Sequence, residues 1–101
     1  MIVTIEAPVR KICPYRLEVD HGSATLTFDI AKGDGPELHT LAARLHDTKD
    51  RVVSHEEYTR NIMDAWGFRG LVSVETHWHT AGLEITCATS QIPQRSQSAT
   101  P

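Results

Sequence analysis

The sequence predicts an α+β domain in which a four-stranded antiparallel sheet carries two helices on one face. Segments that are β-branched, or that alternate between apolar and polar residues, occur in two pairs, one toward each end of the chain. Two segments with apolar residues at helical spacing lie between these pairs. The order strand, strand, helix, helix, strand, strand fits one sheet packed against one helical layer, because each element must bury its apolar side.

Two strands are expected before the helices. Residues 2–9 are rich in β-branched side chains, and residues 23–31 alternate between apolar and polar positions. A polar loop that contains Cys13 and Asp20 joins these strands. The apolar face of the second strand consists of Ala24, Leu26, Phe28 and Ile30.

The first helix is expected over residues 36–46. Gly33 and Gly35 interrupt the strand pattern, and Pro36 suits the first helical turn because its missing N–H would have no partner there. The apolar stripe that follows has helical spacing and consists of Leu38, Leu41, Ala42 and Leu45.

The second helix begins with a capping signature. Ser54 is the expected N-cap and Glu57 stands three residues later, the spacing at which the two residues satisfy each other's backbone N–H groups. Gly67 is expected to end the helix. The apolar stripe between them consists of Tyr58, Ile62, Met63 and Trp66. His55 and Glu56 therefore lie in the first turn.

Two further strands are expected over residues 71–79 and 83–88, joined by a turn at Ala81-Gly82. Trp78 is expected to pack in the core or at an interface. Residues 1–90 then form one domain, and the polar composition of residues 91–101 indicates a disordered tail. A single open sheet has exposed edges, so assembly into a closed ring of identical subunits is expected.

Composition narrows the classes of function. The formal net charge of −3 argues against a broad nucleic-acid surface, although assembly could gather cations such as Arg10, Lys11 and Arg51 into a local basic rim. No apolar run is long enough to cross a bilayer and no signal peptide is recognisable, so a cytoplasmic protein is expected. Two cysteines without zinc or redox spacing are expected to be free thiols.

The spacing of Cys13 and Asp20 indicates covalent chemistry. A thiol becomes an effective nucleophile when a neighbouring group takes its proton, and a carboxylate nearby can do so. Pro14 and the charged residues that follow make a buried, inert cysteine the less suitable interpretation.

These residues also resemble a known family. Cys13 with Asp20 seven residues later, then Glu37, then the His55-Glu56 pair starting eighteen residues after Glu37, is similar to the tunnelling-fold enzymes of the 7-cyano-7-deazaguanine reductase (QueF-like) family. The similarity covers residues 10–88. It implies a tunnelling fold (T-fold) that assembles into a ring with binding sites at subunit interfaces.

The resemblance implies a role for each residue. Cys13 would attack the nitrile carbon of 7-cyano-7-deazaguanine (preQ0) to form a thioimide, and Asp20 would transfer protons, since the nitrile nitrogen needs one. Glu56 would hold the guanine edge, because a carboxylate accepts from both the ring N–H and the exocyclic amine. His55 and Glu37 would lie beside the ligand.

The chain departs from the reductases where they bind NADPH. Residues 37–42 read Glu-Leu-His-Thr-Leu-Ala in place of Glu-Ser-Lys-Ser-Leu-Lys, and residues 80–82 read Thr-Ala-Gly in place of Arg-Gly-Gly. Without these cations a dinucleotide phosphate would be held poorly. The chain is therefore most similar to the short QueF-like amidinotransferases, which need no cofactor and use ammonia to form the formamidine of archaeosine. The substrate would be preQ0, free or in tRNA or DNA.

Three alternatives remain open. The first is an NADPH-dependent 7-cyano-7-deazaguanine reductase. The second is a zinc enzyme of the pterin-synthase type, in which His77 and His79 share a strand face and His39 or His46 supplies a third ligand; no recognisable spacing fixes that ligand, so no metal is expected. The third is a purine-binding ring protein in which Cys13 is inert.

Overall fold

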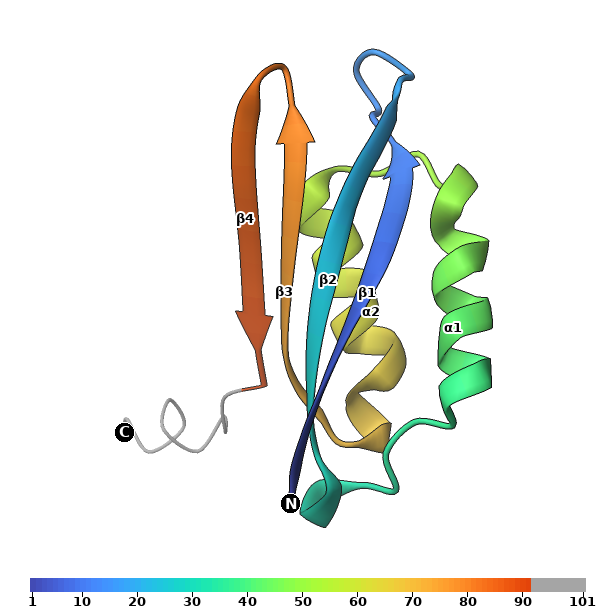
Figure 1. Ribbon diagram of the computed structural model, residues 1–101, viewed down its shortest axis with the longest axis vertical. Helices are drawn as coiled ribbons and strands as arrows, with labels where there is room; N and C mark the ends of the chain where they lie inside the picture. Colours follow the sequence, from blue (N-terminus) through green and yellow to red (C-terminus); the bar gives the residue numbers. More distant parts are fainter. Residues whose placement is uncertain (92–101) are drawn as a thin grey trace, which may run out of the picture.

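The computed structural model describes residues 1–91, which form one antiparallel sheet with the strand order β1-β2-β3-β4 (Figure 1). This agrees with the predicted α+β class. The elements are β1 (Ile2–Ile12), β2 (Val19–Asp29), α1 (Leu38–Asp47), α2 (His55–Trp66), β3 (Leu71–Thr80) and β4 (Leu83–Ser90). Short 3-10 turns follow β2, α1 and α2.

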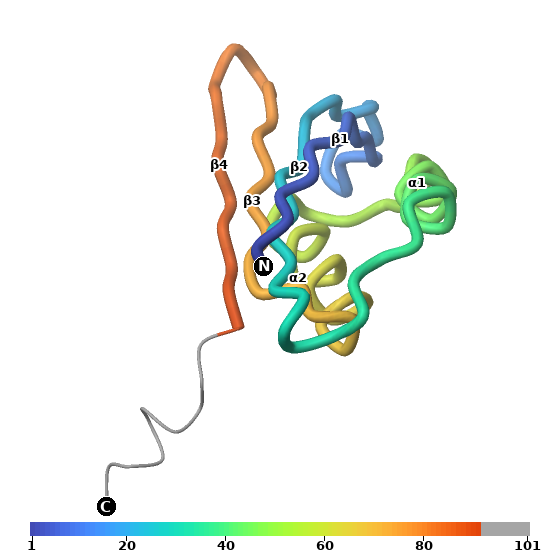
Figure 2. The backbone as a smooth tube through the Cα atoms, turned by 60° about the horizontal axis from the view of Figure 1, so that its bottom comes forward, coloured from blue at the N-terminus to red at the C-terminus, as the bar shows by residue number. Residues whose placement is uncertain are grey.

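Both helices lie on the same side of the sheet (Figure 2). In Figure 1, α2 runs behind the central strands, whereas α1 lies beside edge strand β1. α2 packs against β3 and β4. The most completely buried apolar side chains of the core include Leu26, Phe28, Leu71 and Trp78. β4 forms the other edge of the sheet.

The first two strands continue further into the connecting loop than the sequence pattern predicts. β1 continues to Ile12 and β2 begins at Val19, so Lys11 pairs with Asp20 across the two strands. Asp20 is therefore a strand residue and not part of the loop. The alternation at this end went unrecognised because the inward-facing positions hold a lysine and an aspartate instead of apolar residues.

The helix boundaries follow from their caps. The Ser54 Oγ accepts the N–H of Glu57 at 3.1 Å, which confirms the predicted N-cap of α2. α1 begins at Leu38 and not at Pro36, because the carboxylate of Glu37 accepts the N–H of Thr40 at 2.9 Å and so acts as the N-cap.

Two left-handed turns place the last two strands. Gly67 caps α2 as predicted, but the chain continues through a 3-10 turn, and Gly70 makes the left-handed step before β3 with φ +98°. Ala81 and Gly82 both have positive φ, as a two-residue hairpin turn requires, which confirms the predicted turn.

The expected tail falls almost wholly outside the described residues, which end at Gln91. Gln91 itself donates its N–H to the carbonyl of Val72 at 2.8 Å and so extends the sheet by one contact. Within residues 1–91 no helix has the length and apolar character needed to cross a membrane.

Candidate functional site

A buried ion pair lies beneath the helices at one end of the sheet. Lys11 of β1 and Asp20 of β2 face the helical layer and are only 1% and 5% exposed. The Lys11 Nζ donates to Asp20 Oδ2 at 2.7 Å. Two charges removed from water in this way need close geometry and further hydrogen bonds to compensate for lost hydration. Lys11 is therefore not part of an exposed basic rim.

Thr80 and His55 complete this cluster. The Thr80 hydroxyl donates to Asp20 Oδ1 at 3.2 Å. The Thr80 hydroxyl oxygen also lies 3.2 Å from His55 Nε2. Because the hydroxyl hydrogen is used toward Asp20, the geometry assigns the hydrogen of the neutral imidazole to Nε2. The other nitrogen, Nδ1, is buried, has no hydrogen-bond partner among the described residues and lies 4.0 Å from Asp20 Oδ2.

Trp78 supports this cluster from the centre of the sheet. The imidazole of His55 stacks on its indole at 5.1 Å, and the Lys11 ammonium lies 5.0 Å from the same ring system. The indole N–H donates to Thr76 at 2.9 Å, which fixes the ring. The expectation that Trp78 is a packed aromatic is thus confirmed, with 1% of its surface exposed.

The cluster keeps His55 neutral. Burial lowers the pKa of His55 below its ordinary value of 6.5, and the Lys11 ammonium acts in the same direction. The carboxylates of Asp20 and Glu56 oppose this effect without overcoming it. At neutral pH the imidazole therefore offers Nδ1 as a free hydrogen-bond acceptor. The nearest carboxylate to this nitrogen is that of Asp20, which can receive or return a proton beside it.

Cys13 directly follows the last residue of β1, two positions beyond Lys11. Its N–H donates to the carbonyl of Glu18 at 2.8 Å, and its carbonyl accepts the N–H of Leu17 at the same distance, so the backbone forms a closed turn. Leu17 adopts a left-handed conformation with φ +56° inside this turn. The side chain of Cys13 is half-buried and free of any disulfide. A half-buried thiol at a strand end remains within reach of a ligand.

A second connection joins the Cys13 turn to α2. The segment before α2 runs parallel to the end of β1: the N–H of Ile12 donates to the carbonyl of Arg51 at 2.8 Å, and the N–H of Val53 donates to the carbonyl of Ile12 at 3.2 Å. Two residues after Val53 comes His55. Cys13, Asp20 and His55 thus belong to one end of the molecule.

Glu56 lies on the opposite side of the helix start and faces β4. It lines a cavity of ≈ 340 Å³ between α2 and β4, together with Arg60 and Cys87. Burial raises the pKa of the Cys87 thiol, and the Glu56 carboxylate raises it further. Cys87 is therefore held as a thiol, the less nucleophilic form.

Glu37 is not brought to this cluster within one chain. Figure 1 places the start of α1 at the end of the sheet opposite the β1–β2 turn. The Glu37 carboxylate is largely exposed, and its hydrogen bond to the Thr40 backbone is the main reason why its pKa lies below the ordinary value of 4.5. Its local role is to cap the helix.

The paired histidines of β3 face away from the helices. His77 Nδ1 contacts Thr86 at 3.0 Å and His79 lies 3.8 Å from Glu84, both on the outer face of the sheet. His39 and His46 belong to α1, on the other side. Residues 1–91 contain no group of three or more His, Cys, Asp or Glu side chains arranged to hold a metal ion.

Sequence reasoning missed the participation of Lys11 and Thr80. The sequence contains one indication that Lys11 is buried: it lies two residues after Val9 and therefore on the same face of β1. The resemblance drawn from the sequence recorded Thr80 only as a missing cation. Its hydroxyl role depends on β3 passing beside β2, which no local pattern reports.

Comparisons with known proteins bear on the fold. No protein-family model matches the chain, and no curated protein matches its sequence. Among solved structures it is similar to one described as the archaeosine synthase QueF-Like in the apo form, with a TM-score of 0.73 over 91% of this chain and 96% of that one. The two sequences are 14% identical. The similarity shows that this chain has the QueF-like tunnelling fold.

Proposed function

We propose that this protein is a QueF-like amidinotransferase, which adds ammonia to the nitrile of 7-cyano-7-deazaguanine to form a formamidine. The observation that carries the proposal is the buried cluster of Asp20, Thr80 and His55 at the strand end that bears Cys13. The resemblance of its fold to the archaeosine synthase supports the same class of substrate. The reaction requires no redox cofactor, because the oxidation state of the carbon does not change.

In the first step the Cys13 sulfur bonds to the nitrile carbon. The thiol proton leaves sulfur, and one proton is added to the nitrile nitrogen, which gives a thioimide. Asp20 carries this proton, and the free Nδ1 of His55 is the second acceptor at 4.0 Å from the carboxylate. Lys11 holds Asp20 in place through the transfer.

In the second step ammonia attacks the thioimide carbon and the carbon–sulfur bond breaks. The proton released by the attacking nitrogen returns to sulfur through Asp20, which restores the thiol. The net change is addition of one ammonia across the nitrile. Glu56 accepts hydrogen bonds from the guanine edge in this scheme.

We also propose that copies of this chain assemble through the exposed edges β1 and β4, which places the Glu56 cavity beside a neighbouring subunit. Glu37 caps α1 at the far end of the sheet from the cluster of its own chain, and it has no role in this scheme.

Intact-mass spectrometry tests the covalent step. The protein is mixed with 7-cyano-7-deazaguanine without ammonia, and a mass increase equal to the ligand is expected. Cys13→Ser abolishes the adduct, and Cys87→Ser, the matched control, retains it. Ammonium then releases a formamidine product. Absence of an adduct, or an adduct that only Cys87→Ser removes, contradicts the proposal.

The form of the substrate and the reductase alternative are separated by turnover. Free base, nucleoside, tRNA and DNA that carry the nitrile are each supplied with either ammonium or NADPH. The proposal expects formamidine with ammonium and no amine with NADPH. An amine product would assign the reductase reaction instead.

A further inference from the structure

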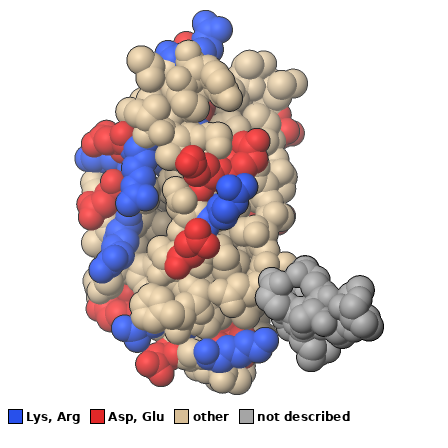
Figure 3. Space-filling model, turned by 180° about the vertical axis from the view of Figure 1, so that it is seen from behind, with Lys and Arg blue, Asp and Glu red and all other residues tan. Residues whose placement is uncertain are grey.

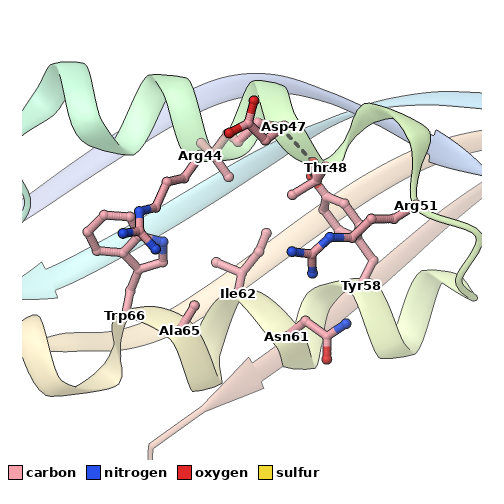
Figure 4. A pocket seen from close by; sticks show the side chains of 10 residues that line it. Arg44, Asp47, Thr48, Arg51, Tyr58, Asn61, Ile62, Ala65 and Trp66 are labelled. Atoms are coloured by element: carbon pink, nitrogen blue, oxygen red, sulfur yellow. Dashed lines mark hydrogen bonds between the residues drawn. The ribbon is translucent and has the colours of Figure 1, made fainter.

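A groove between the two helices shares none of its lining residues with the candidate site, although the ring of its Tyr58 packs on Trp78. It has a volume of ≈ 220 Å³ and is lined from α1, from the turn after it and from α2 (Figure 4). Its floor is apolar and includes Leu45, Ile62 and Trp66, all of which are buried. Arg44 and Arg51 line the α1 side.

Both arginines direct their charge into the groove. Figure 4 shows the guanidinium groups of Arg44 and Arg51 on either side of Ile62, with the carboxylate of Asp47 apart from both. Neither arginine forms an ion pair with any residue in the range 1–91. Among the described residues, the groove therefore holds two arginines without an ion-pair partner, although Asp47 also lines it.

Two hydroxyls of the groove wall are already hydrogen-bonded to each other or to the backbone. The Tyr58 and Thr48 hydroxyls lie 2.7 Å apart, and Thr48 donates to the carbonyl of Leu45 at 2.6 Å. Burial raises the pKa of Tyr58, so its hydroxyl stays protonated. The two guanidinium groups have no ion-pair partner among the described residues, and they lie above an apolar floor. This combination suits a ligand with an anionic group attached to an apolar ring.

We propose that this groove is a second ligand site, which binds a small phosphate monoester with a flat ring, of the nucleoside monophosphate class. A phosphate monoester carries close to two negative charges at neutral pH, and guanidinium groups match its oxygens in geometry as well as charge. The ring covers Ile62 and approaches Trp66. This inference goes beyond the proposed amidinotransferase reaction and does not depend on it.

A nucleic-acid strand fits the surroundings less well. Figure 3 shows acidic and basic side chains mixed over the helical face, and α2 exposes Glu57 and Asp64 along it. A long polyanion would meet these carboxylates, and the chain as a whole carries a formal net charge of −3. The small volume of ≈ 220 Å³ favours a single mononucleotide over a longer strand.

The two tryptophans allow a direct test by ¹H–¹⁵N correlation spectra of the whole chain. The indole N–H of Trp66 reports on the groove, and that of Trp78, which is buried and hydrogen-bonded to Thr76, reports on the candidate site. Adenosine 5′-monophosphate is the probe. It should shift the Trp66 signal saturably and by more than the Trp78 signal, because Trp78 does not line the groove and packs on the ring of Tyr58 at 5.2 Å. Adenosine and inorganic phosphate should each bind at least about tenfold more weakly.

Arginine variants identify the source of the binding. Arg44→Gln and Arg51→Gln should each weaken it by about tenfold or more, the loss of a charge-assisted hydrogen bond. Arg16→Gln removes the same charge from the exposed β1–β2 turn and should change nothing. The proposal is overturned if the Trp66 signal shows no saturable shift or if only the Trp78 signal shifts. It is also overturned if Arg16→Gln weakens binding equally, if phosphate alone binds equally well, or if a single-stranded oligonucleotide binds more tightly.

Discussion

Asp20 and Glu37 are acidic residues at opposite ends of the same sheet, and different contacts hold them. Asp20 is 5% exposed, bonded to Lys11 at 2.7 Å and to Thr80 at 3.2 Å, partners 9 and 60 residues away in sequence. The side chain of Glu37 is 64% exposed and bonds to the backbone of Thr40, three residues on. One carboxylate is held by the tertiary fold, and the other serves its own helix.

This difference separates a structural carboxylate from a candidate catalytic one. At a helix N-terminus, a backbone N–H a few residues away satisfies the hydrogen-bonding capacity of an acidic side chain. Such a carboxylate stays at the surface and does not serve as a proton acceptor in the protein interior. A carboxylate that is buried beside a lysine and an imidazole requires several elements to cooperate, and its removal disturbs all of them. The following predictions test that contrast.

Removal of Lys11 should have the largest effect on stability. Lys11→Met leaves Asp20 buried without its cation, which costs about 3–5 kcal/mol in comparable buried pairs. A small domain has only about 5–15 kcal/mol of stability in total, so the free energy of unfolding from urea titration should fall sharply.

The double variant Lys11→Met/Asp20→Leu is the control for that loss. Replacing both charges by apolar groups removes the unpaired carboxylate, so stability should return to near the original value. A double variant as unstable as Lys11→Met would show that packing at position 11, and not the ion pair, determines the effect.

His55 should make stability depend on pH. Because its pKa in the folded chain is lowered, the unfolded chain binds more protons between that pKa and 6.5. The stability is fully present above 6.5 and decreases as pH falls toward the folded pKa. Urea titrations at several pH values should show this decrease, and His55→Gln should reduce it. An unchanged pH profile in His55→Gln would mean that burial and the Lys11 ammonium do not lower the pKa of this imidazole in the folded chain.

Glu37→Gln should have the smallest effect. Its hydrogen bond to Thr40 lowers the pKa, so the charged form stabilises the fold above pH 4.5 and this contribution is lost as pH falls through the folded pKa. Thermal melting at pH 7 should shift slightly, and the shift should vanish in acid. A loss as large as that of Lys11→Met would contradict the comparison.

Local pattern was sufficient for much of the fold. Alternation located β2 and β3, the Ser54 cap fixed the start of α2, and Ala81-Gly82 fixed the last hairpin. These features depend on neighbours within a few residues. The extension of β1 to Ile12 was missed because a lysine occupies a core position there.

The candidate site shows the same division. Cys13, Asp20, His55 and Glu56 were named from spacing and resemblance, and the structure gathers the first three at one end of the sheet. The ion pair with Lys11 and the hydroxyl bridge from Thr80 arise only when β1, β2 and β3 lie side by side. No spacing along the chain encodes that contact.

The most direct test of the account is the rate at which Cys13 forms its adduct with 7-cyano-7-deazaguanine, measured by mass spectrometry for three chains. Asp20→Asn should slow the reaction about a hundredfold or more, the usual contribution of a proton-transfer group. Glu37→Gln should react at the rate of the unmodified chain. Equal rates for Asp20→Asn and the unmodified chain would contradict the claim that the buried carboxylate serves the thiol.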